Sequence, residues 1–194
     1  MNVFDNLAGA LEIMLGRDHG LQRLDLTADG FWRSFAGLGL MAIIDVAAFM
    51  ATHPQRLTSG EIKTVSALQY SLLSVAIVLI AYGASLVALY VMCRSDHTRT
   101  RFPVAVIAHN WATPVIALAF MPLVVMTALF VPADGGSTLG GMMLIGLLAI
   151  MVIVSIRLIR IPLGISQLHA GLMFLGVAGT SLVLELWLSK TLGL

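Results

Sequence analysis

The sequence predicts an all-α protein: a polytopic membrane helical bundle with five transmembrane helices, preceded by an N-terminal amphipathic interfacial helix. Of its 194 residues, 59% are hydrophobic and 11% are charged, whereas a soluble domain carries about 25% charged residues. Five apolar runs are long enough to cross a bilayer, and the short connections between them leave no room for a soluble domain. We expect a cytoplasmic or interfacial segment at residues 1–30 and a transmembrane domain at residues 31–194.

The segment Asn2–Leu15 has the periodicity of an amphipathic helix that ends near Gly16. Helices that bind anionic lipid usually carry Lys and Arg on their polar side, but this polar side is acidic. The helix therefore lies on lipid or packs against the protein's own cytoplasmic face or a partner. The apolar side holds Val3, Phe4, Leu7, Ala8, Leu11, Met14 and Leu15, and the polar side Asn2, Asp5, Asn6, Gly9 and Glu12.

Each of the five apolar runs approaches or exceeds the 20 or so helical residues that cross a hydrocarbon core about 30 Å thick. Lipid offers no hydrogen bonds to an open backbone, so these runs are expected to be helical. Asp29 is the expected N-cap of the first span, and Trp32 is expected at interfacial depth. The spans are Phe31–Thr52, Ala67–Cys93, Pro103–Val131, Leu139–Arg157 and Gly164–Ser189.

The third span contains Pro114 and Pro122. Each proline removes a backbone hydrogen bond and favours a bend. Neighbouring helices accommodate the bend, or it opens a binding site.

Orientation follows from the basic residues, because positively charged loops resist translocation. A cytoplasmic N-terminus and a periplasmic C-terminus leave three basic residues outside, Arg56, Lys63 and Lys190. The other eight fall inside: Arg17, Arg23, Arg33, Arg94, Arg99, Arg101, Arg157 and Arg160. The run Arg94–Arg101 is most simply an anchor for this topology.

Two carboxyl groups fall within predicted spans, where ionisable residues are costly and mark candidate sites. Asp45 lies about 21 Å along the first span, in its outer half. Glu185 lies near the outer end of the fifth span. Apolar surroundings favour the protonated form of a carboxyl group. These residues either handle protons or cations, or are neutral and hydrogen-bonded to neighbouring helices.

His109 and His169 are predicted at matching depths in the cytoplasmic half of two spans. Two such imidazoles suit the axial ligation of a b-type haem, whereas the neighbouring Asn110 and Trp111 suit polar packing. We expect structural hydrogen bonding, no cofactor and no metal other than a haem held by these two histidines. The candidate intramembrane polar site comprises Asp45, His109, Asn110, His169 and Glu185.

Several functional classes are excluded by composition. A net charge of +1 provides no basic field for nucleic acid. The single cysteine, Cys93, excludes an intrachain disulfide. The sequence contains no phosphate-binding loop, dinucleotide fingerprint, zinc motif or nucleophile elbow, so no catalytic residue is assigned and a non-enzymatic protein is favoured.

The layout of the chain resembles that of small bacterial relatives of the Yip1 family. A cytoplasmic segment precedes five closely spaced helices, the third of which carries His109-Asn110-Trp111-Ala112-Thr113-Pro114 and then Pro122. The segment Phe31-Trp32-Arg33-Ser34-Phe35 is similar to the entry into the first helix of proteobacterial members. The resemblance implies a non-enzymatic protein of the bacterial inner (cytoplasmic) membrane.

These features support three functional hypotheses. The first is a protein that organises membrane or serves as an accessory subunit, with the bilayer and a membrane protein or a second copy as partners. The second is a small transporter or ion-coupled permease component that uses Asp45. The third is a b-type haem electron-transfer subunit with His109 and His169 as ligands.

Overall fold

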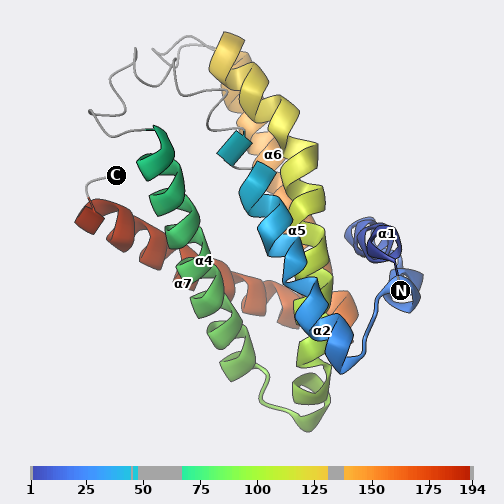
Figure 1. The fold of residues 1–194 in the computed structure, drawn as a ribbon. Helices are drawn as coiled ribbons and strands as arrows, with labels where there is room; N and C mark the ends of the chain where they lie inside the picture. The colour runs from blue at the N-terminus through green and yellow to red at the C-terminus, as the bar shows by residue number, and fades with distance from the viewer. Residues whose placement is uncertain (1, 45, 48–66, 131–137, 193–194) are drawn as a thin grey trace.

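The computed structural model describes residues 2–44, 46–47, 67–130 and 138–192 of the chain, and these are all-helical with no β-strand (Figure 1). Residues 36–44 are helical and follow α2. The other elements are α1 (Val3–Met14), the 3-10 helix η1 (Asp18–Arg23), α2 (Ala28–Ser34), α4 (Ala67–Met92), α5 (Asp96–Phe130), α6 (Thr138–Leu163) and α7 (Gln167–Leu192).

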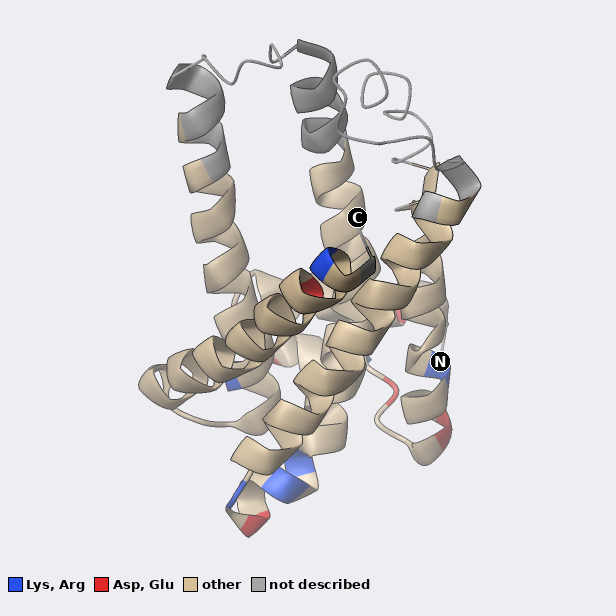
Figure 2. Ribbon diagram, turned by 90° about the vertical axis from the view of Figure 1, so that its left-hand side faces the viewer, with Lys and Arg blue, Asp and Glu red and all other residues tan. Residues whose placement is uncertain are grey.

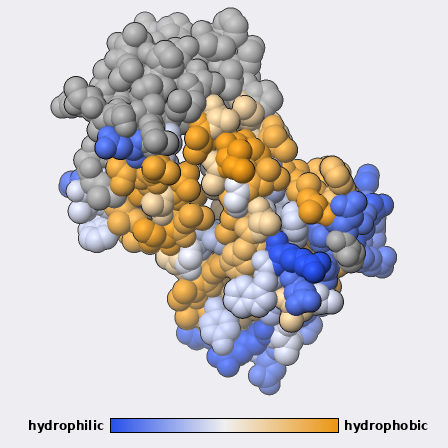
Figure 3. Space-filling model, viewed as in Figure 1, coloured by the Kyte–Doolittle hydropathy of each residue, from blue (hydrophilic) through white to orange (hydrophobic). Residues whose placement is uncertain are grey.

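Four helices in the described part of the chain are long and apolar enough to cross a bilayer. The qualifying stretches are Ser71–Met92, Asp96–Met121, Ile145–Leu163 and Gln167–Thr191, one in each of α4 to α7. Their middle turns carry few charged residues (Figure 2), and apolar side chains form much of the lateral surface (Figure 3). The all-helical class of the described residues is confirmed, and several of their helices have the length and apolar composition that a membrane span needs.

The predicted first span, residues 31–52, lies only partly within the described residues. Its described part is divided by a turn at Phe35, between α2 and the helical residues 36–44. The Ser34 hydroxyl donates to the Phe31 carbonyl oxygen across 2.7 Å at this break.

The predicted N-cap of this region is wrong. Asp29 lies in the first turn of α2, and Thr27 is the N-cap, since its hydroxyl accepts the Gly30 N–H at 3.0 Å. The Thr27 hydroxyl and N–H in turn donate to the Asp25 carboxylate, which holds the pKa of Asp25 below its usual range.

The remaining predicted spans match α4 to α7 in position but not always in length. The helix α5 begins at Asp96 rather than Pro103, because the Ser95 hydroxyl accepts the Thr98 N–H at 3.3 Å and caps it. It continues through Pro114 and Pro122 as one helix. The helix α6 runs beyond Arg157 to Leu163. Charged residues end an apolar run without ending the helix that contains it.

The helix α1 packs against α5 and α6. Its buried residues are Asn6, Gly9, Ala10, Ile13 and Met14. Apolar side chains on its other side are exposed, namely Val3, Phe4, Leu11 and Leu15. Much of the side predicted to be polar thus faces the protein itself, and much of the apolar side does not.

The acidic side of α1 is covered by η1. A Cβ at Gly9 would lie 2.7 Å from the Gly20 carbonyl oxygen, so the two segments cross at glycines. This close crossing places the Glu12 carboxylate 3.4 Å from Arg23 Nε and 3.2 Å from His19 Nε2. The acidic charge that is unusual for a membrane-surface helix is therefore compensated within the chain.

Arginine side chains bond the carbonyl groups at the C-terminal ends of three helices. Arg157 donates to the Met14 carbonyl of α1 (2.8 Å) and Arg101 to the Pro162 carbonyl of α6 (2.8 Å). Arg99 donates to the Cys93 carbonyl just after α4 (3.1 Å). These carbonyls lack intrahelical partners, and a cation is also favoured at the negative end of a helix dipole.

Two of these helix ends share a second feature. Gly16 after α1 and Gly164 after α6 have φ values of +86° and +65°. A Cβ would lie 3.3 Å from Arg157 Nε at Gly16 and 2.7 Å from an Arg101 nitrogen at Gly164. Each glycine thus permits both the left-handed turn and the approach of the capping arginine.

The four long helices are not packed evenly. The helix α4 contacts mainly α7 and has little contact with α5, whereas α6 contacts both α5 and α7. Figure 1 shows α7 crossing the other helices obliquely. The end of α4 and the start of α5 pack against the end of α6 and the start of α7, around the buried residues Cys93, Ala105, Leu163 and Ala170. We call this part of the bundle the arginine end, because five arginines lie there: Arg94, Arg99, Arg101, Arg157 and Arg160.

We expect Arg157→Met to loosen α1 from the bundle and to lower stability by about 1.5–3 kcal/mol, the range for a hydrogen bond to a charged group. Arg160→Met is the matched control, because Arg160 lies 4.0 Å from the exposed Asp18 carboxylate and such pairs contribute about 0–1 kcal/mol. Thermal unfolding in detergent and proteolysis within residues 2–24 measure the difference. Equal effects of the two substitutions would contradict the capping role.

Candidate functional site

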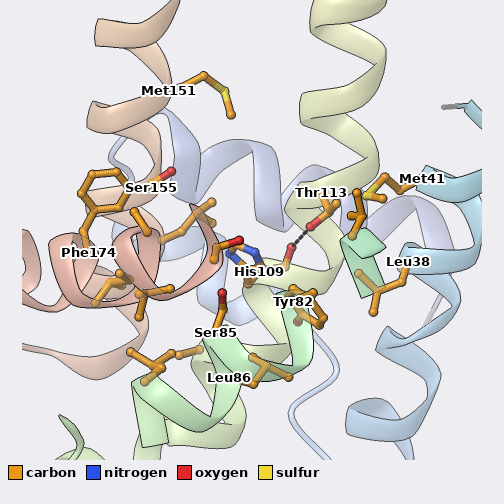
Figure 4. A pocket seen from close by; sticks show the side chains of 18 of the residues that line it. Leu38, Met41, Tyr82, Ser85, Leu86, His109, Thr113, Met151, Ser155 and Phe174 are labelled. Atoms are coloured by element: carbon orange, nitrogen blue, oxygen red, sulfur yellow. Dashed lines mark hydrogen bonds between the residues drawn. The ribbon is translucent and has the colours of Figure 1, made fainter. Parts of the chain in front are cut away.

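A cavity of about 400 Å³ lies between the helices and is lined from residues 36–44 and from α4, α5, α6 and α7 (Figure 4). Its walls are mainly apolar, with side chains such as Leu38, Met41, Leu86, Met151 and Phe174. The polar or ionisable residues of the lining are Tyr82, Ser85, His109, Thr113, Ser155, Ser181 and Glu185. A mostly apolar cavity with few polar groups is the usual form of a small-molecule site.

His109 and Tyr82 form one wall of the cavity. Their rings stack with centroids 5.5 Å apart and planes 13° from parallel. The Thr113 hydroxyl donates to the His109 carbonyl oxygen at 2.8 Å, one turn further along α5 (Figure 4). This bond satisfies the threonine hydroxyl within its own helix and leaves the His109 imidazole to its stacking on Tyr82.

Asn110 stands behind this wall and is fully buried. Its amide nitrogen donates to the Ser34 hydroxyl at 2.7 Å, and its amide oxygen accepts a hydrogen bond from the Tyr82 hydroxyl. Gly37 packs against the Asn110 backbone carbonyl, where a Cβ would clash. Asn110 therefore joins α2, α4 and α5 and holds the Tyr82 ring at the cavity.

Glu185 contributes a carboxylate to the cavity from α7. Its Oε1 accepts a hydrogen bond from the Ser181 hydroxyl at 2.8 Å, one turn earlier in the same helix. No basic side chain lies within 4.0 Å of this carboxylate in the described part of the chain. The cavity thus contains a carboxyl group that has no arginine, lysine or histidine side chain beside it among those residues.

The structure brings three of the predicted site residues together and separates the fourth. His109 and Glu185 line the cavity, and Asn110 lies directly behind it. His169 does not line it, because its exposed ring bonds the Ser166 hydroxyl (2.9 Å) at the start of α7. Asp45 lies outside the described residues. The two histidines that the haem hypothesis would use as ligands thus do not share this cavity.

Sequence reasoning missed the hydroxyl groups of the site, which come from Tyr82, Ser85, Ser155 and Ser181. A signal was present in the helical spacing. Ser181 and Glu185 are four residues apart and Tyr82 and Ser85 three apart, so each pair shares one helix side. Polar pairs of this kind in an apolar helix indicate an inward-facing side.

Within the ranges that the structure describes, no group of three or more His, Cys, Asp or Glu residues could hold a metal ion. Comparison of the chain with known protein families, curated proteins and solved structures finds no match. The cavity and its polar groups are therefore the observations from which a function is argued.

We expect Asn110→Leu to lower stability by about 1–3 kcal/mol, because it leaves the Tyr82 hydroxyl without its partner in a mostly buried position. Tyr82→Phe added to that variant should cost little more, since both partners are then apolar. A double-mutant cycle from thermal unfolding in detergent measures this coupling. Thr113→Val, which removes a hydroxyl bonded only within α5, is the control. Additive losses at positions 82 and 110 would contradict the bridge.

Proposed function

We propose that this chain is a multi-pass membrane protein that binds a small, mostly apolar molecule between its helices, as a carrier or permease component. The observation that carries the proposal is the cavity of about 400 Å³, to which each long helix contributes. A cavity bounded by several separate helices can open and close by small shifts of those helices. Transport needs such a change of access.

The proposal favours the transport hypothesis but moves its polar site. The sequence indicated Asp45, whereas the carboxylate and imidazole that line the cavity belong to Glu185 and His109. Ionisable groups that face a cavity within a membrane protein commonly mark a binding site or pathway. We therefore assign ligand contact to Glu185 and His109, with Asn110 and Ser181 as positioning residues.

We further propose five spans, with the N-terminus and the arginine end in the cytoplasm and the C-terminus on the periplasmic side of a bacterial inner membrane. The support is the charge bias of eight basic residues to three.

We also propose that α1 is an interfacial helix. Phe4 and Leu15 are 76% and 55% exposed, while Glu12 is paired with η1, so an apolar side is available to lipid.

A membrane-organising or accessory-subunit function is the second candidate. The exposed apolar side of α1 favours it, because a helix laid into one leaflet or against a partner helix would bury those side chains. This function does not need the cavity, so the two candidates are separated by ligand binding.

The neutral lipophilic fluorophore N-phenyl-1-naphthylamine tests the binding function in nanodiscs. We expect saturable binding by the native chain, weakened about tenfold or more by Ser155→Trp, because the indole fills the cavity. Ile153→Trp is the matched control two residues away on α6, at a side chain that is 50% exposed. Binding that both variants retain, or no saturable binding by the native chain, would exclude the cavity as a ligand site.

The topology is tested by thiol labelling in a Cys93→Ser background. Thr100→Cys and Lys190→Cys place single thiols at exposed positions near the arginine end and the end of α7. A membrane-impermeant maleimide applied to intact spheroplasts should label position 190 directly and position 100 only after lysis. The reverse pattern would overturn the orientation, and labelling of both before lysis would overturn the three crossings by α5, α6 and α7.

A further inference from the structure

We infer that the cavity selects a small organic cation with an apolar body, such as a quaternary ammonium or a protonated amine. This inference rests on the proposed binding function and adds the charge of the ligand. Glu185 is the only carboxylate among the described lining residues, and none of those residues is Lys or Arg. With the His109 imidazole in its neutral form, the charge that the described lining can present to a ligand is therefore negative or zero.

The contacts of Glu185 leave a place for a positively charged group of a ligand. Glu185 is half-buried, Ser181 donates one hydrogen bond to its Oε1, and no basic side chain of the described residues lies within 4.0 Å of it. A ligand cation beside Glu185 would supply the missing charge. An anionic ligand would be repelled, and a neutral one would leave the carboxylate uncompensated.

Aromatic rings supply a second set of contacts suited to a cation. Tyr82 and Phe174 both line the cavity, and His109 stacks on the Tyr82 ring (Figure 4). The face of an aromatic ring attracts an ammonium group within about 6 Å of its centroid, and the attraction grows when water is excluded. Bonding between Tyr82 and Asn110 holds this ring in place before a ligand arrives.

The remaining walls determine the rest of the ligand. They are mostly aliphatic or thioether side chains, such as Leu38, Met41, Leu86 and Met151, together with the hydroxyl groups of Ser85, Thr113 and Ser155. The apolar groups offer no hydrogen bonds, and three hydroxyl groups are too few to satisfy a sugar, peptide or hydrated ion. A volume of about 400 Å³ suits a compact molecule with a single charged group rather than a full lipid.

A pair of isosteric probes tests the inference, because benzyltrimethylammonium and neopentylbenzene differ mainly in the positive charge. Each is titrated against N-phenyl-1-naphthylamine bound to the native chain in nanodiscs. We expect the cation to displace the fluorophore at a free concentration about tenfold or more below that of the neutral probe. Equal potency, or a preference for the neutral probe, overturns the cation assignment and leaves the binding function intact.

The source of the selectivity is tested with Glu185→Gln and Glu185→Asp. Glu185→Gln should reduce the ratio of the two displacement concentrations to about onefold to threefold, and Glu185→Asp should keep most of the preference for the cation. Full selectivity in Glu185→Gln would overturn the role of this carboxylate. If the glutamine variant does not fold, the comparison of the two probes on the native chain still decides the charge of the ligand. Failure of the fluorophore to bind the native chain overturns both the binding function and this inference.

Discussion

The last carbonyl groups of a helix have no partner within that helix, and arginine side chains bond them at one end of the protein. Arg157 ties α1 to α6, Arg101 ties the end of α6 to α5, and Arg99 ties the end of α4 to α5. Gly16 and Gly164 give two of these arginines room to approach. The residues that bias topology by their charge thus also determine how the segments are joined.

The same requirement operates inside the bundle through Asn110. A fully buried amide must be paired on both its oxygen and its nitrogen, and Tyr82 and Ser34 are its partners. This bridge attaches α4 to α5 at one level, although α4 packs mainly on α7. The cavity lies where α4 and α5 have few other contacts, and Tyr82, which forms the bridge with Asn110, also lines the cavity.

The cavity combines the chemistry expected of a membrane binding site with the geometry that a carrier needs. Its ionisable groups come from two different helices, Glu185 from α7 and His109 from α5. Any relative movement of α7 and α5 would change the distance between those groups. In the carrier that we propose, these two side chains would couple ligand binding to helix movement.

Composition and apolar run length determined the helical membrane class, because backbone hydrogen bonds in lipid can be satisfied within a helix wherever the run occurs. They also located α4 to α7 closely, yet misjudged where α5 begins and α6 ends, since Ser95 and the arginines act through hydrogen bonds that hydropathy does not record.

Counting residues along the helices put Glu185 and His109 at opposite depths, but α7 crosses obliquely and both line one cavity. His169 was predicted at the same depth as His109, but the two side chains do not meet. The His169 ring lies at the exposed start of α7, where it bonds the Ser166 hydroxyl. The sequence by itself determined which residues are costly in lipid, and only the tertiary structure decided which of them meet, because helix tilt and side-chain pairing depend on contacts between segments far apart in the chain.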